Sequence, residues 1–309
     1  MSTQSSGQRL LAHAAMLAFA LMIAGSFTLG ALVVDDIAPV PLNAIRFVIG
    51  AALMGAFALG PMRHRLAFPP APWRFAILGL LMGIYFVSMF VALQFTAPIA
   101  TSAVFTLIPL MAAGFGYVLL GQRTGAVGVL SLILAAIGSV WVIFRGDLAV
   151  LVAFDVGQGE AIYFVGCLCY AVYTPLLRRF SRGEPAIVAS FFTLTATALW
   201  ICLYGIPSIA ATDWLSLAPR VWWVILYLAV FPTALSFFCV QFASLRLPAA
   251  KVIAYGYLTP VFVIGFEGLA GHGWASLSVL AGAAVVVLGL LVLALVPERG
   301  AVRTPAAAP

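Results

Sequence analysis

Charged residues are scarce in this sequence, and acidic ones are the scarcest. Only 8% of the 309 residues are charged and nine are Asp or Glu, whereas 64% are hydrophobic. A water-soluble fold this apolar could not cover its surface with polar groups, so the composition excludes the soluble classes of protein. No Asp or Glu is expected deep inside a helix. The paired carboxylates that an enzyme would need for acid and base catalysis are therefore missing.

Cysteine and histidine are also few, and neither forms a recognisable pattern. The three histidines lie in or near different connections, and no P-loop motif is present. All four cysteines fall inside hydrophobic blocks, which is typical of small packed core residues: Cys167, Cys169, Cys202 and Cys239. The sequence therefore predicts no disulfide, no metal site, no cofactor and no catalytic residue, and it argues against both an enzyme and an ATP-driven pump.

Long hydrophobic runs are abundant instead. They come in blocks of about 20 residues, the length that crosses a hydrocarbon layer about 30 Å thick. The first block, from about Leu11 to Val34, is longer than the apolar core of a cleaved signal peptide, so we expect it to be retained. The sequence predicts an all-α membrane protein with ten transmembrane helices, near residues 11–34, 40–60, 74–96, 98–120, 126–144, 159–178, 185–206, 220–245, 248–269 and 275–296.

The basic residues follow the alternation that ten helices require. Fifteen Lys and Arg residues give a net charge of +6. Arg145 and Arg220 fall on one side and Arg46 inside the second helix, while twelve fall on the other side: Arg9, Arg63, Arg65, Arg74, Arg123, Arg178, Arg179, Arg182, Arg246, Lys251, Arg299 and Arg303. Such a bias predicts that both termini are cytoplasmic, and it explains the charge without a nucleic-acid partner.

Weak internal similarity divides the chain into two halves. A shift of 151 positions places Pro109 on Pro260 and Gly138 on Gly289, and a shift of 144 places Pro41 on Pro185. Because each half holds five predicted helices, an odd number, the second half must enter the membrane from the opposite side. We expect inverted repeats at residues 1–144 and 159–296, an extracytoplasmic linker at 145–158 and a cytoplasmic tail at 297–309, with a substrate site between the repeats.

Three stretches carry a resemblance to a known family. They are AIRFVIGA at 44–51, the run from 92 to 138 that contains TSAVFTLIPLMAAGFGYVLLGQ, and LRLPAAKVIAYGYLTPVFVIGFEGLAG at 245–271 followed by VLAGAAVVVLGLLVL. With these motifs the chain resembles EamA-type exporters of the drug/metabolite transporter superfamily over nearly its whole length. One departure is that the Glu usual after the mid-helix Pro of each repeat is replaced by Gln122 and by His272 or Gly273.

The resemblance implies a secondary transporter that exports small metabolites across the inner membrane by alternating access. Exporters of aromatic or other neutral amino acids are the closest sub-class. The absence of a deep carboxylate favours neutral or zwitterionic substrates, because carriers of cationic drugs and proton antiporters commonly need such an acid. An exporter of drugs or other metabolites remains an alternative, and so does a membrane scaffold without a pathway. The expected partners are the substrate and the lipid bilayer, with no obligatory protein partner.

Arg46 lies five residues after Pro41 in the second predicted helix. An arginine at a helix centre costs about 2.5–3.5 kcal/mol on insertion scales, so it needs a reason to be there. It is either an interfacial residue paired with carbonyls or with Asp35 or Asp36, or a guanidinium that binds a substrate carboxylate.

Other polar and aromatic side chains are candidates for the pathway wall. Tyr163, Cys167, Tyr170 and Thr174 share one face of the sixth helix, which fits either packing or a wall for a substrate ring. Single polar or soft residues in other helices either satisfy each other between helices or line the same pathway: Tyr85, Ser88, Met89, Ser102, Thr106 and Gln241.

The ninth predicted helix carries the remaining candidates. Lys251, Tyr255 and Thr259 repeat every four residues, and Lys251 either extends to the interface or turns into the cavity. Pro260 and its equivalent Pro109 are predicted to interrupt their helices, either as static kinks or as hinges.

Overall fold

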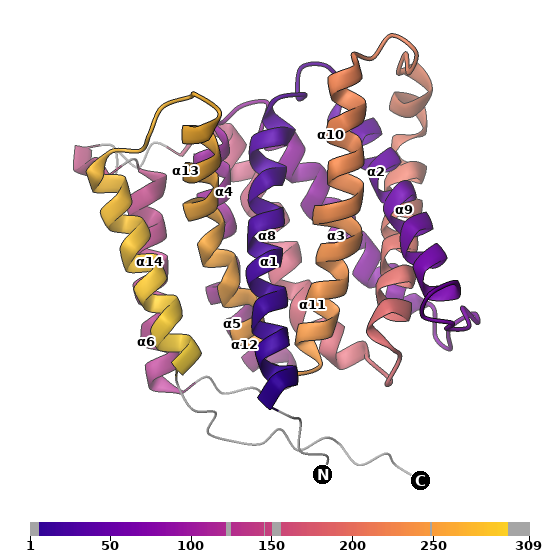
Figure 1. Cartoon of the computed structure of the whole chain (residues 1–309), viewed down its shortest axis with the longest axis horizontal. Coiled ribbons are helices and arrows are strands. Elements are labelled where there is room, and N and C mark those ends of the chain that lie inside the picture. The colour runs from indigo at the N-terminus through magenta and orange to yellow at the C-terminus, as the bar shows by residue number, and fades with distance from the viewer. Residues whose placement is uncertain (1–5, 122–124, 145, 150–155, 248, 296–309) are drawn as a thin grey trace.

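The computed structural model describes residues 6–121, 125–144, 146–149, 156–247 and 249–295, and every regular element in them is helical. Figure 1 shows the helices as one bundle, most of them running roughly along a common direction. The bounds are α1 (Ser6–Ala31), α2 (Pro39–Leu59), α3 (Trp73–Ala92), α4 (Pro98–Phe105), α5 (Ile108–Leu120), α6 (Ala126–Ile143), α8 (Gln158–Phe180), α9 (Ala186–Ala211), α10 (Pro219–Ala229), α11 (Ser236–Ser244), α12 (Ala249–Ala254), α13 (Thr259–Leu269) and α14 (Leu277–Leu295). A π-helix, Val230–Leu235, joins α10 to α11, and a 3-10 helix, Tyr255–Leu258, joins α12 to α13.

The lengths of these helices fit a membrane protein. Among the described residues, seven helical stretches are long and apolar enough to cross a bilayer, counting α4 with α5 and α10 with α11 as one stretch each. Shorter apolar helices cover Ala126–Val142 and Leu277–Val292. The all-α membrane class is thus confirmed, while ten crossings and the proposed repeat boundaries stay predictions. The tail at 297–309 lies outside the described residues, and so do residues 145 and 150–155 of the linker at 145–158.

Prolines decide where several helices begin and where two of them are interrupted. Pro39, Pro98 and Pro219 each occupy the first position of a helix, where a missing N–H costs nothing. Pro109 and Pro260 are the second residues of α5 and α13, each directly after a break in the α-helical pattern. The interruptions predicted at both prolines are therefore present. Whether they act as hinges stays a prediction.

The interruption before Pro260 corrects one inference drawn from the sequence. The common face of Lys251, Tyr255 and Thr259 assumed a continuous α-helix with about 3.6 residues per turn. Residues 255–258 form a 3-10 helix instead, with about 3.0 residues per turn, so the register shifts before Thr259. Thr259 is fully buried, whereas Tyr255 is half-buried.

Helices from the two halves of the chain pack against each other. The pairs with the most extensive contact are α6 with α14, α2 with α9 and α3 with α8, followed by α3 with α9 and α5 with α8. The first helix, α1, packs on α11 and α13. Figure 1 shows α6 and α14 at one edge of the bundle and α2 and α9 at the opposite edge. The helices between them enclose the core, so any central site must combine side chains from both halves.

Glycines allow two of these pairs to approach closely. A Cβ atom on Gly138 of α6 would lie 2.7 Å from the carbonyl oxygen of Gly282 in α14. A Cβ on Gly79 of α3 would lie 2.7 Å from the backbone of Ala196 in α9. Small residues at such contacts let helices associate in lipid, where the hydrophobic effect does not drive helices together.

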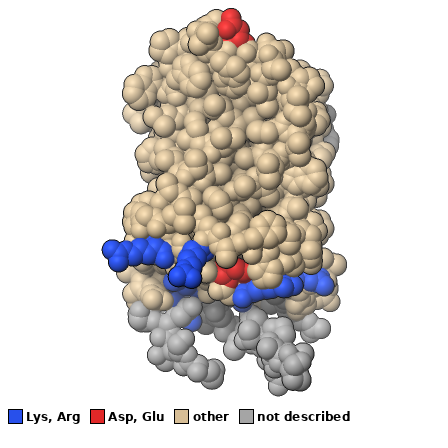
Figure 2. All heavy atoms as spheres, turned by 90° about the vertical axis from the view of Figure 1, so that its right-hand side faces the viewer, with Lys and Arg blue, Asp and Glu red and all other residues tan. Residues whose placement is uncertain are grey.

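Basic side chains gather at one end of the bundle, which we call the basic end. Its members include Arg74 at the start of α3 and Arg178 and Arg179 in the last turn of α8. Figure 2 shows a band of Lys and Arg with an acidic side chain among them at this end of one face, and further acidic atoms at the other end. At that opposite end Arg220 binds Asp36 at 2.8 Å. The bond from Arg220 lowers the pKa of the Asp36 carboxyl.

One ion pair at the basic end joins three segments. Arg74 binds Glu184 at 2.7 Å and also donates to the carbonyls of Pro70, Ala71 and Phe180. Only 3% of the Arg74 side chain is exposed. Arg74 therefore fixes the end of α8 and the α8–α9 connection to the start of α3.

We expect this pair to make stability depend on pH. Partial burial opposes ionisation of Glu184, but hydrogen bonds from the Arg182 N–H and from Arg74 outweigh it and lower the pKa of the carboxyl below 4.5. The stabilisation is then fully present above the unfolded-state pKa and is lost as the pH falls through the folded-state pKa. Thermal unfolding between pH 3 and 6 should show a smaller acid-side decline for Glu184→Gln than for the native chain. Equal declines would contradict this assignment.

Candidate functional site

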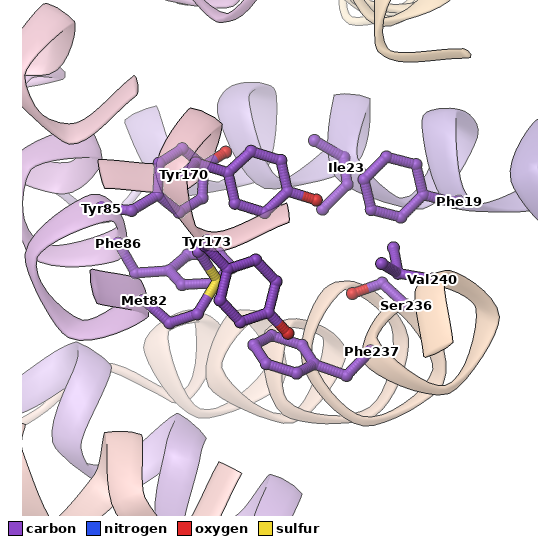
Figure 3. Close-up of a pocket in the computed structure, with 10 residues that line it drawn as sticks. All are labelled: Phe19, Ile23, Met82, Tyr85, Phe86, Tyr170, Tyr173, Ser236, Phe237 and Val240. Atoms are coloured by element: carbon purple, nitrogen blue, oxygen red, sulfur yellow. The ribbon is translucent and has the colours of Figure 1, made fainter. Parts of the chain in front are cut away.

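A narrow cavity lies at the centre of the bundle, between α1, α3, α8 and α11 (Figure 3). Its free space is close to that of a single water molecule. The wall is mainly aromatic and apolar: Phe19, Ile23, Met82, Tyr85, Phe86, Tyr170, Tyr173, Ser236, Phe237 and Val240. A flat apolar molecule is the kind of ligand that such a wall suits, provided that the helices move apart to admit it.

Stacked tyrosines form one side of this cavity. The rings of Tyr85 and Tyr170 stack with centroids 4.8 Å apart, and those of Tyr170 and Tyr173 stack at 5.7 Å. The hydroxyl of Tyr163 donates a hydrogen bond of 2.9 Å to the hydroxyl of Tyr85. Figure 3 shows the hydroxyls of Tyr170 and Tyr173 directed toward the side chains of α1 and α11. The wall thus offers ring faces and phenol groups, and none of its described side chains is charged.

The sequence prediction located part of this wall. Of the candidates, Tyr85 and Tyr170 line the cavity and Tyr163 lies directly behind them through its bond to Tyr85. The predicted stripe on the sixth helix is buried throughout, as expected for a face directed into the bundle: Tyr163, Cys167, Tyr170 and Thr174.

Other candidates do not line the cavity in this structure. The hydroxyls of Ser88, Ser102 and Thr106 each donate to a carbonyl three residues earlier in their own helices, and Met89 is fully buried. Gln241 lines a separate cavity at the basic end, together with Arg74 and Glu184 among others. The pathway role of these residues stays a prediction.

Tyr255 lies against α1, and neither it nor Lys251 is among the side chains that line the central cavity. The hydroxyl of Tyr255 is 2.8 Å from Nδ1 of His13. Lys251 is partly exposed in the short helix α12, one helical turn before Tyr255. The contact between His13 and Tyr255 joins α1 to the 3-10 helix that lies between α12 and α13.

Several wall residues were missed by sequence reasoning. Tyr173 follows Tyr170 by three residues, which helical spacing could have included in the stripe. Ser236 and Val240 are four residues apart in α11, and Phe19 and Ile23 are four apart in α1. Such spacing occurs all along apolar helices, so nothing in the sequence distinguished these faces from those that contact lipid.

Arg46 is the most deeply placed charge among the described residues, and the structure corrects its interfacial interpretation. Its side chain is fully buried, and Asp36 binds Arg220 instead. Nε of Arg46 donates to Oγ1 of Thr233 at 3.0 Å, and Nη1 lies 3.5 Å from Oδ1 of Asn43. The guanidinium therefore depends on neutral partners in the interior of the bundle.

A bundle of apolar helices with a central cavity walled by both halves of the chain fits the architecture of a membrane transporter. The comparisons with known proteins agree. The sequence profile of the EamA-like transporter family matches residues 10–144 and 158–295, and the chain belongs to this family. It is a multi-pass membrane protein, and in bacteria its location is the inner membrane.

Two individual proteins are similar to this chain over most of its length. The chain is 24% identical over 295 residues to the uncharacterized transporter YyaM of Bacillus subtilis (strain 168), with 94% of each chain covered. A solved crystal structure with 23% sequence identity superposes with a TM-score of 0.72 and covers 94% of this chain and 99% of its own, which shows a shared fold.

Proposed function

We propose that this transporter exports aromatic or other neutral amino acids, or similar small metabolites, by alternating access, and that it has no enzymatic activity. The observation that supports this most is the tyrosine wall of the central cavity. Stacked rings give an aromatic side chain a matching surface, and the phenol groups supply hydrogen bonds within it. The cavity is almost closed here, so exchange of substrate requires the helices to separate toward one side at a time.

The proposed architecture has ten crossings in two inverted five-helix repeats, and three findings support it. The family profile matches the two halves of the chain separately. In the proposed repeats α11 is the counterpart of α3, and α8 is the counterpart of α1. The contact of α3 with α8 is then matched by the contact of α11 with α1. Gly138 approaches Gly282, and Gly289 approaches Ser131. The shift of 151 positions places Gly138 on Gly289 and Ser131 on Gly282, so the two contacts are equivalent.

The direction of the chain in the membrane follows from its charges. The basic end carries most of the described Arg residues, and the positive-inside rule assigns such an end to the cytoplasm. Both termini are then cytoplasmic, and Asp36 faces the opposite side. Arg123, Arg145, Arg299 and Arg303, which entered the original count, lie outside the described residues.

Alternating access needs elements that change shape, and the interrupted helices are our candidates. Pro109 and Pro260 each follow a break that leaves backbone groups without regular helical partners. In transporters such breaks lie where helices bend or where carbonyls face the pathway. We assign hinge roles to both prolines, and we assign the substrate carboxylate to Arg46 or Lys251.

Flux through the purified protein tests the proposed function. Proteoliposomes loaded with labelled phenylalanine, tyrosine, leucine or an organic cation should release the aromatic amino acids fastest and the cation slowest, because no acidic side chain lines the described cavity. Replacing Tyr170 by alanine should slow the aromatic substrates more than leucine. Fast release of the cation alone would favour the drug-exporter alternative, and no release of any compound would favour the scaffold.

A further inference from the structure

The guanidinium of Arg46 is not fully satisfied inside the bundle. Arginine carries five N–H donors and no acceptor. One donor bonds Thr233 well and one reaches Asn43 at the limit of hydrogen bonding, whereas Nη2 has no partner among the residues that the structure describes. No carboxylate within that part of the chain forms an ion pair with Arg46. A buried charge in this state lacks an anion.

Aromatic rings supply the remaining contacts of this charge. The guanidinium carbon lies 4.6 Å from the ring centroid of Phe86, 5.2 Å from that of Phe47 and 5.4 Å from that of Phe90. Ring faces attract a cation, but less strongly than an anion does. Phe86 also lines the central cavity, and Phe237 of the same wall stacks on it at 6.2 Å. The charge is thus separated from the cavity by one layer of rings.

The π-helix beside Arg46 places the bond to Thr233. Thr233 lies within Val230–Leu235, where the wider helical turn departs from the α-helical pattern, a feature common near functional sites. Because the Nε bond to Thr233 fixes the orientation of the planar group, the Nη atoms are held in place for a second ligand.

Among the described residues, the cavity offers no comparable binding partner for a positively charged ligand. No Asp or Glu is among the described residues that line it, and the hydroxyl of Ser236 already donates to the carbonyl of Pro232. An ammonium group buried here would have no anionic partner and would also be repelled by Arg46. Recognition in this cavity therefore favours a negatively charged group over a positively charged one.

We propose that Arg46 is an anion-binding site and that the transporter recognises small aromatic carboxylic acids by their carboxylate, whether or not they carry an amino group. Direct contact requires the ring of Phe86 to turn aside. The inference rests on the proposed substrate cavity, and it extends the substrate class from amino acids to acids that lack the amine. Both oxygens of a carboxylate match the fork of a guanidinium.

Four related probes separate the two charges of an amino acid. We would measure the thermal stabilisation of the purified protein, and flux in proteoliposomes, with 3-phenylpropanoate, phenylalanine, phenylalaninamide and 2-phenylethylamine. The acid should bind at least as well as phenylalanine, and both should bind about tenfold to a hundredfold better than the amide and the amine. Equal binding of all four, or binding of phenylalanine without binding of the acid, would overturn the proposal.

Substitutions connect this preference to Arg46. Arg46→Met and Arg46→Gln should remove the preference for acid over amide, and the preference should survive in the matched control Arg220→Gln, whose charge lies at the outer surface. Arg46→Met should also keep or raise the unfolding temperature, because replacing an unpaired buried charge by an apolar side chain is often stabilising. Destabilisation together with an unchanged preference would show that Arg46 is only structural.

The outcomes distinguish this inference from the proposed function. Export of amino acids with the same rates in Arg46→Gln would leave the proposed function intact and overturn the anion site. Stabilisation by 3-phenylpropanoate that depends on Arg46, without any export of amino acids, would support the anion site and contradict the proposed export of amino acids. Inorganic phosphate at equal concentration serves as a further arm, and an equal shift with phosphate would overturn the assignment to aromatic acids.

Discussion

Replacing Arg74 by alanine should lower the free energy of unfolding by about 3–5 kcal/mol, the largest loss we expect from a single side chain. The substitution leaves Glu184 partly buried with no countercharge. It also removes the bonds to the carbonyls of Pro70, Ala71 and Phe180. Because breaking a buried pair costs more than the pair contributes, the basic end should open before the rest of the bundle.

The measurement is urea or thermal unfolding of the purified protein in detergent. Arg220→Ala is the matched control, since it breaks an exposed pair with Asp36 that should contribute little to stability because water screens it. The double substitution Arg74→Ala with Glu184→Gln should recover part of the loss, because it no longer leaves a charge behind. Similar losses for Arg74→Ala and Arg220→Ala would show that burial of this pair does not govern the basic end.

Replacing Gly138 by leucine should separate α6 from α14 and cost about 1–3 kcal/mol or more. Even a single Cβ would lie 2.7 Å from the Gly282 carbonyl oxygen and 3.0 Å from the backbone nitrogen of Val286, and backbone atoms cannot turn aside as a flexible side chain does. The small separate core that these helices form around Leu132 and Val286 would lose its packing.

Gly114→Leu provides the control for this substitution. Gly114 is also an interior residue of an apolar helix, α5, but a Cβ there meets nothing within 4 Å, so leucine should be neutral or slightly stabilising. Unfolding of both variants in the same detergent measures the difference. Equal stability of the two would mean that α6 and α14 are not held by this close contact.

Features set by neighbouring residues along the chain were predictable. The apolar blocks and their proline starts placed the helices within a few residues of the described ones, because helix formation in a membrane depends on local hydrophobicity and on local backbone bonding. The buried stripe on α8 followed from spacing alone. The 3-10 helix at Tyr255–Leu258 was not predicted, since regular spacing was assumed up to Pro260.

The candidate site was predictable only in part, for a different physical reason. Tyr85 and Tyr170 were identified by residue type, but they share a wall because α3 packs on α8, a contact between residues 85 positions apart. The apolar members of the wall, such as Phe237, look the same in sequence as side chains that face lipid. Only the neighbouring helices decide which of these faces is enclosed.

The sequence by itself determined that this chain lies in a membrane, which family it resembles, and that its basic residues gather at one end. These properties are sums over composition and short-range pattern. The tertiary structure alone decided that Arg46 is buried beside Phe86 and Thr233 instead of reaching the interface, because its surroundings come from α3 and from a π-helix 187 residues further along the chain. Burial and partners of a charge depend on packing between distant segments, and no local pattern encodes them.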